Sequence, residues 1–375
     1  MDMKLIDNIC DNLIRQPKRY YKIDQLIPKE FFYQYDFYIR EDFIVRNKFG
    51  IALKCSHYKP PYPCYKNNQT FPCVIYCHGT GGNRLECLEI IRFLLPLNIT
   101  VVSFDFSGCG MSGGRNNTSG YNEKYDIGAV VKYIKECGHT SSIGLWGRTA
   151  GAVASILYAK EDPTISSMIL DTPFSSLSQL IEENYIAPMK LPKIVSTLYM
   201  LIIKNKIKMA AHFSVSSLDI ASAAQNIYIP AIFVHDKQDK FILNHHSDQV
   251  AFIDGERSPS FYNSAALFFS NILNPPRDIQ CVYDEDDIRL VTIPLEYNNK
   301  SDNNSYNNLN TTVMRTMSSS CFRLQQQQED IIVHNNKDNK IIIDDNQEQN
   351  CFGNRLNSKL ALKTIKEEQL SIDIK

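Results

Sequence analysis

Short apolar runs alternate with segments of helical period through the middle of the chain. The runs are uncharged and rich in β-branched residues, which predicts strands buried on both faces of a parallel sheet. We expect these strands at Phe71–Cys77, Ile99–Phe104, Ser142–Trp146, Ile165–Leu170 and Ile229–Val234. We expect helices at Arg84–Leu95, Tyr121–Cys137, Ala150–Lys160 and His245–Ile253. Alternation of this kind predicts the α/β class with a doubly wound, mostly parallel sheet.

Two segments break the alternation. Asp42–Asn47 and Ile51–Tyr58 flank a short turn containing Gly50, which predicts an antiparallel hairpin leading into the sheet. Residues 174–228 have helical character and lie between two predicted strands. We interpret them as a helical cap over the carboxyl edge of the sheet, where open α/β folds bind ligands. Their apolar stripe could also dock on a membrane or lipid, but packing on the core is the preferred interpretation.

The composition changes sharply after Pro294. About a third of residues 298–350 are Asn or Gln, and such polar, low-complexity sequence cannot offset the entropy of ordering. We therefore expect a mostly disordered tail over 277–375, with a marginal helix near Leu356–Leu370. Residues 41–276 would form the main domain, and residues 1–40 an extension packed on it.

Charge and apolar content exclude several classes of protein. The 375 residues are 43% hydrophobic, and 40 Lys and Arg balance 41 Asp and Glu to a net charge of −1. Because no global field would attract a polyanion, we expect no nucleic-acid partner. The most apolar window, Ile194–Ile207, contains Lys204 and Lys206, so we expect no transmembrane segment. Met1–Asp11 does not resemble a secretory signal, which favours a cytoplasmic location.

The cysteines predict neither a metal site nor a disulfide framework. Eleven are scattered from Cys10 to Cys351 without a CxxC pair, and the two nearest in sequence, Cys73 and Cys77, share one predicted strand. We interpret them as thiols in a reducing compartment.

Three loops that follow predicted strands contain the candidate chemistry. His78–Gly82 is glycine-rich and can direct backbone N–H groups toward an anion, as in an oxyanion hole. Asp105–Gly114 has a similar composition. Alone, either loop could be a plain turn or a phosphate nest, although no Lys follows in the P-loop arrangement. Gly147–Gly151 has the spacing of a G-x-S-x-G nucleophile elbow, with Thr149 in place of Ser. Farther along, the carboxylate of Asp239 follows the last clear strand, where a hydrolase acid would orient a histidine.

The motifs HGTGG, DFSGCGMSGG, GLWGRTAGA, ILDTPFS and FVHDKQDKFI, in this order, resemble the α/β-hydrolase superfamily. The similarity is to its serine aminopeptidase-like branch of eukaryotic cytosolic proteins and runs from about Asn12 to Pro276. It implies the α/β-hydrolase fold, no cofactor and no metal. It also implies an acyl, ester or peptide ligand, and a Ser, Asp and His that form and hydrolyse an acyl-enzyme.

Transfer of these roles assigns the nucleophile to Thr149 and the acid to Asp239. The oxyanion donors become the backbone N–H groups of Ala150 and Thr80. His78 and Gly79, in the same loop as Thr80, complete the expected substrate-binding set.

The expected histidine is missing. In the family it lies after one more strand, in a G-D-H-N-S-x-R-P pattern, and only the Arg, Pro and Phe-Tyr neighbours of that pattern are recognisable in Gln249–Tyr262. About fifteen to twenty residues of helix end and final strand are also absent by this comparison. Among other histidines, His78 would lie nearest to the elbow, whereas His245 and His246 follow Asp239 too closely. We interpret all three as structural or solvent-exposed, and Asp171 as a residue that ties down its loop.

The sequence therefore predicts weak or absent hydrolysis, since loss of a triad member can cost on the order of a millionfold in rate. One alternative is a non-catalytic ligand-binding or scaffold protein, a pseudoenzyme that uses the inherited pocket or the tail. Another is an active hydrolase whose gene model lacks the codons for the histidine segment. The sequence does not predict an oligomeric state.

Overall fold

The computed structural model describes residues 2–34, 36–61, 70–225, 227–236, 239–250 and 259–276. All of them fall within one compact unit that spans Met1–Ser318. The expected tail over 277–375, and the parts of the expected histidine and acid motifs at 251–258 and 237–238, lie outside the described residues.

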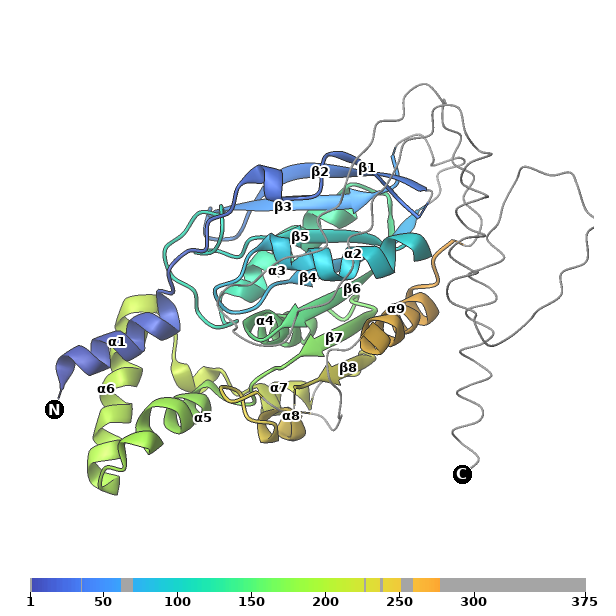
Figure 1. Ribbon diagram of the computed structural model, residues 1–375. Coiled ribbons are helices and arrows are strands. Elements are labelled where there is room, and N and C mark those ends of the chain that lie inside the picture. Colours follow the sequence, from blue (N-terminus) through green and yellow to red (C-terminus); the bar gives the residue numbers. More distant parts are fainter. Residues whose placement is uncertain are drawn as a thin grey trace, which may run out of the picture. The chain divides into compact units, whose positions relative to one another are not determined.

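A single eight-stranded sheet forms the centre of this unit (Figure 1). Its strand order is β1-β2-β3-β5-β4-β6-β7-β8. The strands are β1 (Glu30–Tyr33), β2 (Asp36–Arg46), β3 (Ala52–Lys59), β4 (Phe71–Cys77), β5 (Thr100–Phe104), β6 (Thr140–Arg148), β7 (Ser167–Asp171) and β8 (Ala231–Val234). β1, β2 and β3 pair antiparallel, and β3 joins β5 antiparallel; the pairs from β5 through β8 are parallel.

Helices cover both faces of the sheet, and every residue of β4, β5 and β7 is buried. One face carries α3 (Glu123–Glu136) and α4 (Ala150–Ala159), and the other carries α2 (Leu88–Leu94), preceded by η3 (Arg84–Cys87) and followed by η4 (Leu95–Leu97), together with α9 (Pro259–Leu273). Along β4, Cys73 and Ile75 join the first core cluster and Val74 and Tyr76 the second, as period-two alternation requires.

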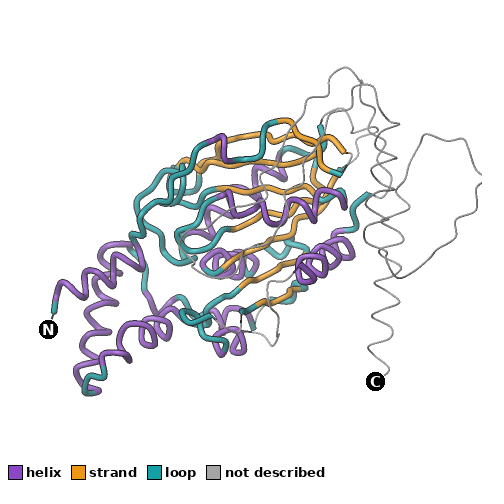
Figure 2. Tube along the Cα trace, in the orientation of Figure 1, coloured by secondary structure: helices purple, strands orange, loops and turns teal. Residues whose placement is uncertain are grey.

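The insertion between β7 and β8 is helical, and it contacts the beginning of the chain. It contains α5 (Leu177–Ile181), the π-helical turn η5 (Glu182–Ile186), η6 (Ala187–Met189), α6 (Lys193–Ala211), η7 (Val215–Ser217) and α7 (Ile220–Ala224). After β8, α8 (His245–Val250) precedes α9. Helix α1 (Met3–Ile14) lies beside α6 (Figures 1 and 2). The Asp2 N–H donates to Tyr199 Oη at 3.1 Å, and Lys206 pairs with Asp7.

A buried ionic network ties the loops after β4 and β5 to the antiparallel strands. Asp105 is inaccessible to solvent and accepts hydrogen bonds from Tyr21 Oη at 2.8 Å and from the Arg84 N–H at 2.8 Å. The Arg84 guanidinium donates to Tyr21 and to Ser56 Oγ, and lies 3.6 Å from Asp42. These contacts fix the start of η3, which directly follows the glycine-rich loop His78–Gly82.

The predicted α/β class and its alternating elements are confirmed, with element ends that shift by only a few residues. The hairpin of β2 and β3 is also found. The sequence did not predict β1, which is only four residues long, the 3-10 turn η1 (Ile23–Gln25), or α1, whose short apolar face packs against distant α6.

Candidate active site

A sharp turn joins β6 to α4 at Thr149. Its backbone angles are φ 50° and ψ −109°, outside the regions that L-residues prefer, and it is the N-cap residue of α4. The Thr149 N–H donates to the carbonyl of Asp171 at 2.7 Å, and its own carbonyl accepts from Val153 at 3.0 Å. The residue is therefore held in a strained conformation by neighbours on both sides.

The glycines around Thr149 are required by close backbone contacts. A Cβ at Gly147 would lie 2.5 Å from the Gly151 carbonyl oxygen. A Cβ at Gly151 would lie 2.0 Å from the Cys77 oxygen, at the end of β4. Any larger residue would push α4 away from the neighbouring strand, so the G-x-T-x-G spacing reflects the packing of this turn.

The two expected oxyanion donors, Ala150 and Thr80, differ from Gly79 in the hydrogen bonding of their N–H groups. Ala150 is the first residue of α4, where a backbone N–H has no intrahelical acceptor. The Thr80 N–H likewise donates to no acceptor among the described residues. The Gly79 N–H, in contrast, donates to the buried carboxylate of Glu86 at 3.0 Å. Gly79 therefore fixes its loop rather than offering a free donor.

His78 has a structural environment. Its ring is inaccessible to solvent, and its Nδ1 lies 2.8 Å from the Gly79 carbonyl, while Nε2 accepts from the Phe106 N–H at 3.0 Å. Both contacts are satisfied by the neutral tautomer protonated at Nδ1. The imidazole thus joins the loop after β4 to the loop after β5 and has no nitrogen left for a ligand.

Asp239 caps its own loop. Its Oδ1 accepts from the N–H groups of Phe241 at 2.8 Å and Ile242 at 2.9 Å. No described histidine hydrogen bonds to Asp239 or to the Thr149 side chain, so the structure does not bring these two residues into a triad. Asp171, at the end of β7, accepts from Thr172 Oγ1 at 2.9 Å and lies 3.8 Å from Arg148 Nε, which ties down the loop beside Thr149.

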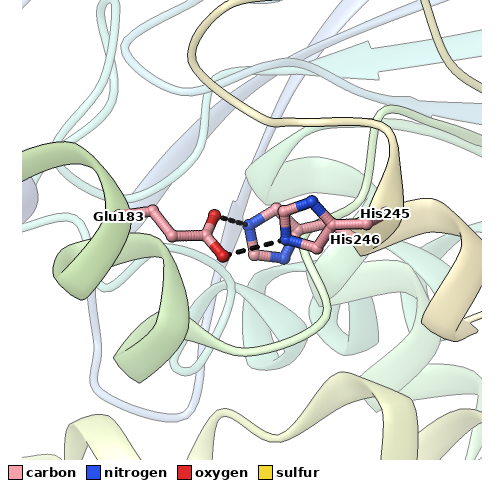
Figure 3. A group of neighbouring side chains, drawn as sticks. All are labelled: Glu183, His245 and His246. Carbon is pink, nitrogen blue, oxygen red and sulfur yellow. Dashed lines mark hydrogen bonds and ion pairs between the residues drawn. The ribbon is translucent and has the colours of Figure 1, made fainter. Parts of the chain in front are cut away.

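Two further histidines lie together in a cluster that the sequence did not predict (Figure 3). Nε2 of His245 lies 2.9 Å from Glu183 Oε1, and Nε2 of His246 lies 3.0 Å from Glu183 Oε2. Burial lowers the pKa of His246, and the Glu183 carboxylate opposes this without cancelling it. Burial would raise the pKa of Glu183, but the Gln179 amide and the two histidines reverse this and hold it below its ordinary value.

The sequence offered only a weak signal for this cluster. The adjacent pair His245–His246 at a helix start was visible in the sequence. Glu183, however, belongs to the cap, which precedes β8, whereas the two histidines follow β8. The contact of Glu183 with the two histidines depends on the path of the cap back to the sheet, and the pattern of apolar residues in the sequence does not determine that path.

A cavity of about 310 Å³ lies away from the Thr149 turn. Phe71, Thr100 and Thr140, at the starts of β4, β5 and β6, contribute to its wall, as does His57. It therefore lies at the amino edge of the parallel strands, opposite the edge that carries Thr149.

Known proteins resemble this chain mainly over the parallel part of the sheet and the cap. The α/β-hydrolase fold family matches residues 72–225. An uncharacterised protein of Bacillus subtilis, YqkD, is 27% identical over 53% of this chain and 63% of its own length. Protein bem46 of Schizosaccharomyces pombe is 32% identical over 29% of this chain and 38% of its own. The lysophosphatidylserine lipase ABHD12 of Xenopus tropicalis is 28% identical over 29% of this chain and 30% of its own. The matches thus span less than two thirds of these relatives.

Solved structures share the fold of this chain. An esterase of Pyrococcus furiosus, Pf2001, superposes with a TM-score of 0.51 at 18% identity, covering 69% of this chain and 99% of the esterase. In the part of the chain that the structure describes, no helix is long and apolar enough to cross a membrane. The sheet order, the strand-to-helix turn, the family match over residues 72–225 and the relatives together support assignment to the α/β-hydrolase superfamily.

Proposed function

We propose that this protein descends from a serine hydrolase of the serine aminopeptidase-like branch and binds an acyl, ester or peptide group at the Thr149 turn. In this proposal it hydrolyses its ligand weakly or not at all. The observation that carries the proposal is Thr149 itself: a hydroxyl on a strained strand-to-helix turn, with no hydrogen bond to a described histidine. The neighbouring N–H of Ala150 has no acceptor among the described residues.

The turn retains features for binding a polarised carbonyl. The N–H groups of Ala150 and Thr80 have no acceptor among the described residues, and donors fixed in this way stabilise developing negative charge on oxygen. His78 and Gly79 hold the loop of Thr80 in place through their own hydrogen bonds. The donors are therefore positioned before any ligand arrives, which favours binding.

Turnover requires a group that the site lacks among its described residues. For Thr149 Oγ1 to attack a carbonyl carbon, its proton must pass to a base, and the same base must later protonate the leaving group. His78 has both ring nitrogens occupied, and Asp239 caps its own loop. Rate losses on the order of a millionfold accompany the loss of such a base.

The cellular location we propose is the cytoplasm. The described cysteines are free thiols, and six of these seven are buried, which suits a reducing compartment.

A fluorophosphonate probe of serine hydrolases tests the catalytic part of the proposal. The purified full chain should show no more labelling than Thr149→Ala, and the matched control Thr197→Ala, a change at an exposed threonine of α6, should behave as wild type. Strong labelling that Thr149→Ala abolishes would contradict it.

The binding part is tested separately. Short-chain acyl esters should raise the melting temperature of the wild-type chain without releasing alcohol or acid. No shift with any ester, amide or peptide at millimolar concentration would favour the scaffold alternative, in which the turn is an inherited remnant.

A further inference from the structure

We propose that Glu183, His245 and His246 form a binding site for a divalent transition metal of the zinc type. The carboxylate comes from η5 in the cap, and the two imidazoles come from the first turn of α8 (Figure 3). One ligand atom from each residue can be chosen so that all lie within 4.8 Å of one another. The site is independent of the proposed function at Thr149.

The distances suit a metal with little rearrangement. Zinc binds His nitrogen and carboxylate oxygen at about 2.0–2.2 Å, so tetrahedral ligand atoms lie about 3.3–3.5 Å apart. The two oxygens of Glu183 now lie 2.9 and 3.0 Å from the Nε2 atoms of His245 and His246. Zinc would take the place of the Nε2 proton of each imidazole, this proton moving to Nδ1, and each pair of Glu183 and His atoms would need to open by only about half an ångström.

The donor types also fit. Two neutral imidazoles and one carboxylate are a known set for zinc with three protein ligands, which leaves a fourth position for water. Calcium and magnesium prefer oxygen ligands and are disfavoured by the two nitrogens.

Outer hydrogen bonds already orient the ligands. Ser175 Oγ lies 2.8 Å from His246 Nδ1, the ring nitrogen that would face away from the metal. Gln179 Nε2 donates to Glu183 Oε1 at 2.9 Å and lies 3.0 Å from His245 Nε2. Such partners fix ring orientation in metal sites, and their loss costs about 10- to 100-fold in affinity.

The cluster is built into the fold, with access from one side. The His246 side chain is fully buried, whereas those of His245 and Glu183 are 40% and 24% exposed. The stacked rings of the two histidines, 4.6 Å apart, restrict each other. Glu183 lies on a π-helical turn, a rare local geometry that recurs at functional sites. A bound ion would join the cap to α8.

Cobalt provides the direct test, because its absorption reports ligand type. The full chain, freed of metal by chelator dialysis, is titrated with Co²⁺ and then back-titrated with Zn²⁺. We expect one Co²⁺ per chain with a nitrogen and oxygen spectrum, displaced by one Zn²⁺. A thiolate-to-cobalt charge-transfer band would place the ion on cysteines and overturn the proposal, as would the absence of any stoichiometric binding.

Variants assign the site. Glu183→Gln and His245→Ala should each weaken binding by at least about 100-fold, and Ser175→Ala by about 10- to 100-fold. His212→Ala, at an exposed histidine after α6, is the matched control and should bind as wild type. Circular dichroism of the metal-free proteins identifies variants that remain folded. Wild-type affinity in folded Glu183→Gln would overturn the proposal even if His245→Ala failed to fold.

Discussion

Replacing Thr149 with glycine should stabilise the protein, although it removes the proposed ligand-facing hydroxyl. Thr149 has a φ of 50° and a ψ of −109°, and its side chain makes no capping hydrogen bond to α4. A non-glycine residue held in such a conformation costs about 1–3 kcal/mol, and β-branching adds to the crowding.

The expected gain follows from two opposing terms. Glycine removes the strain of about 1–3 kcal/mol but loses about 0.5–1 kcal/mol more backbone entropy on folding. The net increase in the free energy of unfolding is therefore about 1 kcal/mol, which corresponds to a rise in melting temperature of roughly 2–4 °C for a domain of this size. Thr149→Ala, which removes the branch but keeps Cβ, should fall between wild type and Thr149→Gly.

Urea unfolding and differential scanning calorimetry of the three proteins provide the measurement. The order Thr, Ala, Gly of increasing stability supports the strain argument. A loss of more than about 1 kcal/mol in Thr149→Gly would refute it, because the threonine side chain would then contribute packing that exceeds its backbone strain.

Three further changes have calculable effects. Gly151→Ala places a Cβ 2.0 Å from the Cys77 oxygen and should lower the free energy of unfolding by at least about 3 kcal/mol in chemical denaturation. In the control Gly128→Ala, the Cβ meets only the Tyr158 ring at 3.1 Å, and stability should change by no more than about 1 kcal/mol. Equal effects of the two changes would contradict the packing argument. Arg84→Met leaves buried Asp105 without its guanidinium partner and should lower the free energy of unfolding by about 3–5 kcal/mol. The control Arg15→Ala breaks an exposed pair with Asp11 and should lower it by less than about 1 kcal/mol in the same assay. Burial, with a smaller effect of neighbouring Lys59, lowers the pKa of His57 from 6.5 to about 3. The folded state therefore resists protonation of His57. The stability that neutral His57 contributes is present above pH 6.5 and is lost as the pH falls toward 3. Between about pH 7 and pH 5 wild type should lose about 2 kcal/mol more than His57→Gln in urea unfolding, and parallel pH profiles would show that His57 takes up a proton freely in the folded state.

The sequence predicted the parallel part of the fold well because burial on both faces leaves a strong local signal. β4 matches its expected range, Phe71–Cys77, and each of its residues is buried. The glycine spacing around Thr149 predicted a sharp turn, and the positive φ there has the same steric origin.

Features that depend on tertiary contacts were not accessible in the same way. Helix α1 gains its stability from α6, and the pairing of Glu183 with two histidines depends on the path of the cap. His78 was expected in the substrate-binding loop without a catalytic role, and the structure adds its backbone partners, Gly79 and Phe106. The roles of Thr149, Ala150, Thr80 and Asp239 remain predictions for the experiments above.

The contact between α1 and α6 has a consequence for synthesis of the protein. Asp2 and its partner Tyr199 are 197 residues apart, so the first helix leaves the ribosome long before the helix that covers it. At about 5–20 residues per second, the apolar face of Ile6, Ile9 and Leu13 waits for roughly 10–40 s without its native partner. During that interval the apolar face of α1 is exposed, and transiently exposed apolar surface of this kind is prone to aggregation.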